Sequence, residues 1–482
     1  MYKAKMYKTQ RKQLMRREDK MRKRLIGMVA VLLAAALVTT GCPQQAAEVE
    51  EPCSEPNEVR NVIFFHPDGY GLSHWNALRI LLVGPDGRLN WDRLPYMAPY
   101  TEHMKDALTA SSHGGATVHA YGMKVARDSF GLDGDQVITA LSGKQMSIME
   151  EAVQAGFATA LIQSGCITEP GTAVFVASVE DRGMREEIAK QVIESGVDVI
   201  LGGGERWLLP KGVTGRHGEE GKRTDGLNLI ERAKELGYTV VYTRDELMEV
   251  AAGGATKVLG VFASGHTFND EPEEVLRAEE LPHYWPWAPT IAEMSAAALE
   301  ILSRNPKAAE KGIFIVAEEE ATDNFPNNAN AMGSFIAGER ADAAFGVFAD
   351  FVEENPNTLL ITAADSSAGG KHLLQQPGVE KVGEVRINTR DGEWIKAPLL
   401  DGVDGPGTAP FLSAFLSAPD REGNQWQFAV AWATPHDLSG GIVARAKGLN
   451  ADLITELGVV DNTDIYRIMY YTLFEEWLGE AR

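Results

Sequence analysis

The sequence predicts an α/β protein with a doubly wound, mainly parallel central sheet and helices on both faces. Short apolar runs typical of strands alternate along the chain with segments of helical periodicity. With 482 residues, 44% of them hydrophobic, the chain is long enough to form one large domain of this kind. In such sheets the chemistry is expected at the carboxyl ends of the strands.

The elements follow one another from residue 59 onwards. Strands are expected at 61–65, 158–163, 197–201, 238–243, 257–263, 312–317 and 358–364. Helices are expected between them at 146–155, 184–195, 227–236, 291–303 and 341–354. A segment rich in Gly, Pro and Asp, about 371–432, is expected as an insertion with hairpins of its own.

The N-terminal region has the pattern of an export signal. Residues 1–24 are basic, residues 25–38 form an apolar run, and small residues lead into Cys42. That run has the size of a signal-peptide apolar region and is short for a membrane span. The small residues before Cys42 resemble a bacterial lipobox, which predicts a signal peptide at 1–41 and a lipid anchor in the cell envelope. The alternative is plain cleavage with an unanchored product. An acidic tether is expected at 42–58, and the catalytic domain at 59–482.

The charge of the chain excludes some partners. Residues 1–41 carry 11 Lys and Arg against 2 Asp and Glu. Their removal would change the net charge of the chain from −22 to −31. Such an acidic protein is not expected to bind nucleic acid, and a phosphorylated substrate would need local cations. Bound metal ions are the natural source of those cations.

Carboxylates follow three of the expected strands, and a serine segment lies between them. Asp68 follows the first strand, Glu318 and Asp323 follow 312–317, and Asp365 follows 358–364. Clustered acids repel one another unless a divalent cation neutralises them, so together they indicate a hard-metal site. Ser112 precedes small residues and an expected helix start, where a phosphoryl group can approach free N–H groups.

The order of these motifs resembles the alkaline phosphatase family over nearly the whole mature chain. The resemblance rests on NVIFFHPDGYGLS, SSHGGATVHAYGMK, EPGTAVFVASVEDR, GIFIVAEEEATDNFPNNAN, NTLLITAADSSAGG and PHDLSGG. It implies that Ser112 is phosphorylated and that Arg182 binds phosphate. It also implies zinc and magnesium as cofactors, held by a ligand set of Asp68, Glu318, Asp323, Asn327, Asp365, Ser366 and His436.

Several positions depart from the family pattern. The family usually has His where this chain has Asn327 and Ser366, and Asp where it has Ser111. Near Glu169, Gly171 stands at the column of a magnesium-site Thr, with Thr172 adjacent. Ser111, Glu169 and Thr172 are expected at the metals or beside them. Because carboxylate, amide and hydroxyl oxygens suit harder cations, magnesium, manganese or calcium become alternatives to zinc.

The function that the resemblance implies is metal-dependent hydrolysis of phosphate monoesters through a phosphoserine, with release of inorganic phosphate. Small phosphorylated compounds are the expected partners, and a homodimer is an open possibility for the assembly. The chain has neither the G-x-S-x-G of a triad hydrolase nor a P-loop. A phosphodiesterase or phosphonate hydrolase on the same fold, or a degenerate binder of phosphate compounds, stays open.

Overall fold

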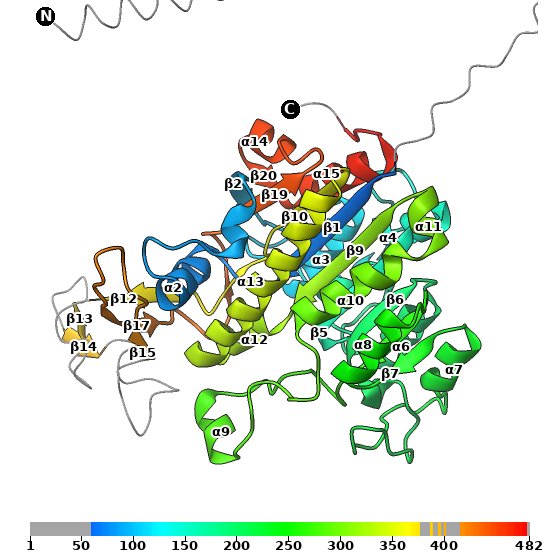
Figure 1. Ribbon diagram of the computed structural model, residues 1–482, viewed down its shortest axis with the longest axis horizontal. Helices are drawn as coiled ribbons and strands as arrows, with labels where there is room; N and C mark the ends of the chain where they lie inside the picture. The colour runs from blue at the N-terminus through cyan, green and yellow to red at the C-terminus, as the bar shows by residue number, and fades with distance from the viewer. Residues whose placement is uncertain (1–58, 376–385, 389–393, 397–399, 402–414, 480–482) are drawn as a thin grey trace, which may run out of the picture. The chain divides into compact units, whose positions relative to one another are not determined.

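The computed structural model describes residues 59–375, 386–388, 394–396, 400–401 and 415–479 (Figure 1). The signal peptide expected at 1–41, the tether at 42–58 and the anchor residue Cys42 lie outside these residues, as does part of the expected insertion. Within the described ranges, no helix combines the length and the apolar character that crossing a bilayer requires.

A central sheet organises the described part of the chain (Figure 1). Its ten strands there are, in spatial order, β20 (Val460–Asp461), β2 (Tyr96–Thr101), β19 (Val443–Gly448), β10 (Thr358–Thr362), β1 (Asn61–Pro67), β9 (Ile313–Glu319), β5 (Ala158–Cys166), β6 (Val199–Gly203), β8 (Val258–Val261) and β7 (Thr239–Val241). Adjacent strands from β10 to β7 pair in parallel, whereas β19 is antiparallel to both of its neighbours. The mainly parallel sheet predicted from the sequence is confirmed.

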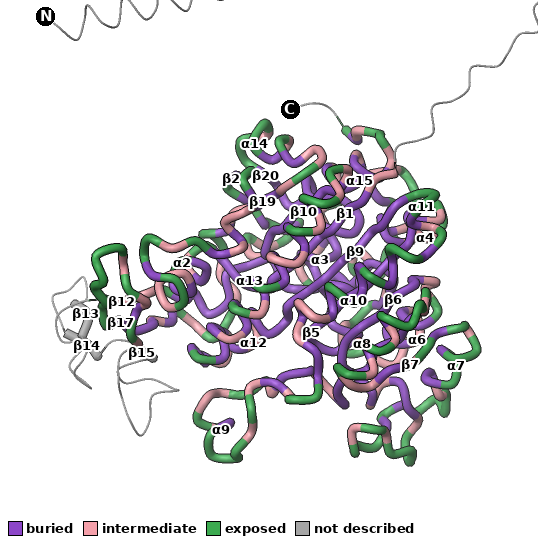
Figure 2. The backbone as a smooth tube through the Cα atoms, in the orientation of Figure 1, coloured by how far each residue is buried: buried purple, intermediate pink, exposed green. Residues whose placement is uncertain are grey.

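Helices cover both faces of this sheet, which explains why β1, β5 and β9 are buried along their whole length. Val62 and Phe64 pack into one apolar core, and Ile63 and Phe65 pack into the other, because successive strand residues point to opposite faces. Figure 2 shows the buried strands between exposed outer helix surfaces.

The helices fall into two groups by the core to which they contribute. The first core receives side chains from α3 (Ser112–Tyr121), α4 (Ile148–Ala155), α6 (Arg185–Glu194), α7 (Leu229–Glu235), α14 (Leu453–Leu457) and α15 (Asn462–Phe474). The second receives them from α2 (Leu72–Leu82), α8 (Arg244–Ala252), α10 (Ile291–Ser303), α11 (Pro306–Glu310) and α13 (Ala331–Glu354). Shorter helices are α5 (Pro170–Ala173), α9 (Glu273–Ala278), α12 (Ala321–Asn327), η1 (Asn90–Arg93) and η2 (Glu205–Trp207).

One helix is longer than its sequence pattern suggested. The expected helix at 341–354 begins instead at Ala331, where the Asn330 side chain caps it by accepting a hydrogen bond from the Gly333 N–H. Asn is a favoured cap residue because its side-chain oxygen satisfies a free N–H group of the first turn. The small residues of this first part weaken the helical pattern in the sequence.

The segment around 371–432 forms small sheets apart from the central one. β12 (His372–Leu374), β15 (Leu400–Asp401) and β16 (Phe415–Leu416) all pair with β17 (Gln427–Ala431), and β13 (Arg386–Asn388) pairs with β14 (Trp394–Lys396). Two further pairs are β3 (Leu132–Asp133) with β4 (Gln136–Val137), and β11 (Ser367–Ala368) with β18 (Asp437–Leu438).

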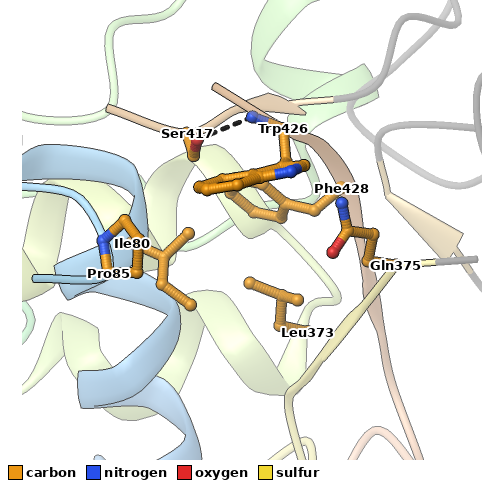
Figure 3. Close-up of a pocket in the computed structure, with 7 residues that line it drawn as sticks. All are labelled: Ile80, Pro85, Leu373, Gln375, Ser417, Trp426 and Phe428. Carbon is orange, nitrogen blue, oxygen red and sulfur yellow. Dashed lines mark hydrogen bonds between the residues drawn. The ribbon is translucent and has the colours of Figure 1, made fainter. Parts of the chain in front are cut away.

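An apolar pocket of about 260 Å³ lies where this segment meets α2 (Figure 3). Ile80 and Pro85 face Leu373, Trp426 and Phe428 across it. Among its lining residues in the described part of the chain there is no carboxylate, which distinguishes it from the acidic site described next.

Candidate active site

Ser111 and Ser112 stand at the start of α3 but have different surroundings. The Ser111 hydroxyl caps the helix: it accepts a hydrogen bond from the Gly114 N–H at 3.2 Å and donates to the Arg127 carbonyl at 2.5 Å. The Ser112 hydroxyl instead faces Asp68: although burial opposes it, Asp365, His66 and, to a smaller extent, Ser112 lower the pKa of that carboxyl group to about 2. Ser112 is therefore the hydroxyl that faces the acidic site, and Ser111 is held in the cap.

Asp68 and Asp365 meet at the carboxyl ends of β1 and β10. His66 lies between them, with its Nε2 at 3.3 Å from Asp68 Oδ1 and 3.8 Å from Asp365 Oδ1. Its Nδ1 is 2.8 Å from the Ala363 carbonyl, which can only accept, so Nδ1 carries a proton. Nε2 therefore faces the two carboxylates, where it can donate to Asp68 or, without its proton, bind a cation together with them.

Gly115 allows α3 to lie directly against this pair. A Cβ added to Gly115 would be 2.7 Å from the Asp365 Cβ, closer than real side chains approach. The small residues that mark the serine segment in the sequence thus have a packing role at the site.

A second acidic group forms at the end of β9. Ligand oxygens of Asp68, Glu318 and Glu320 lie within 4.8 Å of one another, and all three residues are buried. Glu319 points to the other side, where it accepts hydrogen bonds from Ser164 Oγ at 2.6 Å and the Tyr284 hydroxyl at 3.0 Å. The sequence reasoning missed Glu320. Glu320 follows the strand and is the residue before α12, with helical backbone angles, so strand alternation alone does not predict its direction.

A third group brings together Asp323, Asn327 and Asp437. The Asn327 Nδ2 lies 3.0 Å from both carboxylate oxygens of Asp323, one turn earlier on α12, and 3.0 Å from Asp437 Oδ1. The Asn327 Oδ1 accepts a hydrogen bond from the Gly369 N–H at 3.1 Å.

The structure does not bring the predicted ligand His436 to these acidic groups. His436 is exposed, and the described residues include no hydrogen bond or ion pair between its side chain and a carboxylate of the site. The next residue, Asp437, begins β18, which pairs with β11 next to Ser366, and its side chain contacts Asn327. Asp437 is therefore a second candidate at this position, and the role of His436 stays a prediction.

Arg182 lies at the margin of the site and is held by Glu169. Its Nη2 is 2.9 Å from Glu169 Oε2, and Arg185 Nη1 is 2.5 Å from Glu169 Oε1. Although burial opposes it, Arg185, His266 and Arg182 lower the pKa of Glu169 to about 2. Burial and the charge of Arg182 lower the pKa of His113 to about 4, which places Arg182 near the residue after Ser112.

Gly171 and Thr172 lie in α5, where the sequence departs from the family pattern. A Cβ added to Gly171 would lie 1.9 Å from Glu318 Oε1, so the glycine makes room for that carboxylate. Thr172 is buried, and the described contacts include no hydrogen bond from its side chain.

The donor set fits divalent cations. Asp68 Oδ2, Glu318 Oε1, Glu320 Oε2, Asp365 Oδ2 and Ser366 Oγ are buried oxygens without a hydrogen-bond partner in the described structure. Burial and then neighbouring carboxylates raise the pKa of Glu318, Glu320, Asp323 and Asp365 well above the ordinary range. Without a cation these acids keep their protons to a higher pH than free carboxyl groups do, and a cation would replace the protons and satisfy the unpaired oxygens.

Comparison with known proteins agrees with this geometry. Residues 59–473 match the family model of alkaline phosphatase. The chain belongs to the alkaline phosphatase family. Tissue-nonspecific alkaline phosphatase of Felis catus is 28% identical over 461 residues, which cover 86% of this chain and 84% of the relative. Alkaline phosphatase 3 of Bacillus subtilis is 25% identical over 395 residues, covering 78% and 76%.

The fold agrees with a solved alkaline phosphatase as well. The crystal structure of the Thermus thermophilus enzyme superposes with a TM-score of 0.65 at 23% identity, covering 88% of this chain and 93% of that one. Membership of the family makes this chain a phosphatase-type hydrolase of phosphoric esters, and the candidate acidic and imidazole groups agree with the divalent metals that alkaline phosphatases generally use.

Proposed function

We propose that this alkaline phosphatase relative hydrolyses phosphate monoesters through a phosphoserine at Ser112, with harder divalent cations at its site. The observation that carries the proposal is the position of Ser112. It stands at the start of α3 beside Asp68, where buried carboxylates with unpaired oxygens converge.

Three groups of side chains would hold the cations. One consists of Asp323 and Asp437, whose carboxylates both accept from the Asn327 Nδ2; a second of Asp68, Asp365, Ser366 and His66; and a third of Asp68, Glu318 and Glu320. Nearly all of their donor atoms are oxygens, which supports magnesium, manganese or calcium over zinc. Bound cations would acidify a hydroxyl and stabilise the charge that develops on the transferring phosphoryl group.

The residues of the chain supply the remaining chemistry. Ser112 Oγ attacks phosphorus and gives up its proton to solvent; the Oγ–P bond forms while the ester P–O bond breaks, and the departing alcohol takes up a proton. Water then attacks the phosphoserine, releasing phosphate and restoring the hydroxyl. The free N–H groups of the first turn of α3 face the transferred group. Arg182, held in place by Glu169, has further N–H donors for its outer oxygens.

The test compares the two adjacent serines. Ser112→Ala is expected to lower the turnover of an aryl phosphate by several orders of magnitude and to abolish the phosphoenzyme seen by mass spectrometry after an acid quench. Ser111→Ala is the matched control. It should keep the phosphoenzyme but destabilise the fold by about 1 kcal/mol, because it removes a helix cap. Phosphate recovered on Ser111, or near-normal turnover by Ser112→Ala, would overturn the proposal.

A further inference from the structure

A cavity of about 220 Å³ lies next to the active site, at the carboxyl ends of β5, β6 and β8. Its walls include Cys166, Arg185, Arg206, Trp207, Lys222 and His266. Cys166 ends β5, Arg185 begins α6, Arg206 and Trp207 belong to η2 after β6, and His266 follows β8. The cavity therefore opens at the sheet edge where doubly wound folds bind their ligands.

The lining is unusually basic for so acidic a chain, whose net charge is −22. Arg206 contacts Glu219 only at 3.8 Å, and its buried Nε has no hydrogen-bond partner among the described residues. Lys222 forms no ion pair in that part of the chain, and its Nζ lies 5.4 Å from the centroid of the Trp207 ring. The buried Nδ1 of His266 is also without a partner there.

The cavity and the acidic site share a wall. Arg185, which lines the cavity, holds Glu169, and Glu169 in turn holds Arg182. On the other side, a Cβ added to Gly165 would lie 3.1 Å from His266 Nδ1 and 3.0 Å from the Glu320 Cγ. Gly165 and the ion pairs of Glu169 thus lie between the basic lining and the residues proposed to bind phosphate and cation.

We infer that this cavity binds a second anionic group of the substrate, so that the preferred substrates are phosphate monoesters carrying another phosphate or a carboxylate. The inference rests on the proposed function. Arg and Lys side chains have N–H donors and no acceptors, and they form their strongest hydrogen bonds with oxyanions. The unpaired Arg206 Nε and the unpaired Lys222 ammonium are the groups expected to contact it.

The main test compares alkanediol bisphosphates of graded spacer length with alkyl phosphates of the same length. At one spacer length the kcat/KM of the bisphosphate is expected to exceed that of the alkyl phosphate by about tenfold or more. An effect of this size is what charge-assisted hydrogen bonds to the second phosphate would give. Arg206→Gln combined with Lys222→Gln should remove this preference and leave kcat/KM for the alkyl phosphates unchanged. Arg216→Gln combined with Lys234→Gln is the charge-matched control, because these two residues pair with Glu246 and Glu231 on the surface, and it should keep the preference.

A binding measurement separates this inference from the proposed function. Alkane bisphosphonates and alkylphosphonates cannot be hydrolysed, and titration calorimetry with excess magnesium compares their affinities. If no ester is turned over, the proposed function fails, while tighter bisphosphonate binding that the double variant loses still supports the cavity. Equal affinity for both compounds, with normal turnover, overturns the inference alone. A second outcome also overturns it. If the parent protein shows no preference for bisphosphonates and the double variant loses the binding of inorganic phosphate, the cavity is an anion site separate from the substrate.

Discussion

At the scale of single residues, the site differs from its family in the type of atom it offers to a cation. The resemblance to the family places imidazoles at Asn327 and Ser366, and in the structure Asp437 lies beside Asn327 while His436 is exposed. Oxygen ligands favour harder cations, and imidazole favours zinc. His66 is the one nitrogen donor that the described residues bring into a candidate metal group.

Restoring the imidazoles should change the metal preference. We expect the triple variant Asn327→His, Ser366→His, Asp437→His to bind zinc at least about tenfold more tightly than the parent chain does, and magnesium more weakly. Elemental analysis of protein purified without chelator, followed by competition titration after metal removal, measures this. The unmodified protein is the control, because it already has an imidazole at His436. Two tightly held zinc ions in the unmodified protein would contradict our view that oxygen ligands dominate the site.

Glu320 and Glu319 form a matched pair for testing the acidic group on β9. Both are buried, but only Glu320 points towards Asp68 and Glu318. Glu320→Gln should weaken magnesium binding by about tenfold or more, while Glu319→Gln, which changes a site bonded to Ser164 and Tyr284, should leave it nearly unchanged. The magnesium-induced rise in melting temperature reports the difference without any need for turnover. Equal losses in the two variants would place the cation elsewhere.

At the scale of elements, close backbone approaches bring the functional groups together. α5 packs on β9 through Gly171, whose backbone leaves room for the Glu318 carboxylate, and α3 packs on Asp365 through Gly115. Glycine permits such contacts because it has no Cβ. The positions of the carboxylates thus depend on how tightly two short helices approach strand ends.

Gly171→Ala tests this dependence. The added methyl group would lie 1.9 Å from Glu318 Oε1, so the carboxylate or α5 must move. We expect a loss of at least about tenfold in magnesium affinity, together with a lower melting temperature, because overpacking usually costs about 1–3 kcal/mol. Gly253→Ala is the control, since Gly253 has ordinary backbone angles at the end of α8, far along the chain. Unchanged magnesium affinity in Gly171→Ala would show that Glu318 is not a ligand.

The sequence predicts elements better than it predicts which side chains meet. Fully buried parallel strands such as β1 and β9 are continuous apolar runs, so they could be read directly, and α10 was predicted with its observed bounds. The start of α13 was missed because small residues obscure its pattern. His66 was left out of the predicted ligand set because nearness in sequence to Asp68 does not show where its ring points. Glu320 and Asp437 were not predicted because their positions depend on the turn after β9 and on a pairing between distant segments, β11 with β18.

At the scale of the whole molecule, the acidic site has a cost for stability that depends on pH. Four carboxyl groups, those of Glu318, Glu320, Asp323 and Asp365, have a pKa raised by burial and by one another. In the unfolded chain these groups ionise near pH 4. Above that pH the folded, metal-free protein holds protons that the unfolded chain has released. Its free energy of unfolding must therefore fall as pH rises, until the groups ionise in the folded state too.

Other groups restrict the pH range in which this effect can be measured. Burial lowers the pKa of His74, His113, His119, His266 and His283, and such groups make stability rise with pH. That contribution is complete once unfolded histidine is neutral, above about pH 7. Burial raises the pKa of the Cys166 thiol, which lowers stability where an unfolded thiol ionises, near about pH 8.5. The interval from about pH 7 to about pH 8 therefore isolates the carboxyl groups.

Between these two pH values, metal-free protein in a chelating buffer should lose about 1 kcal/mol of stability per pH unit for each carboxyl group still protonated. Saturating magnesium should remove most of this slope, because the cation takes the place of the protons and the folded site then titrates no further. Denaturant unfolding at several pH values, with chelator and with magnesium, measures both slopes. In the metal-free protein, the fall of the free energy of unfolding with pH should also be less steep in Glu320→Gln than in Glu319→Gln, because Glu320 lies among the other acids. If stability in chelator is constant or rises over this interval, the carboxyl groups are already ionised in the folded state. The raised pKa values, and with them the replacement of protons by a cation, would then be wrong.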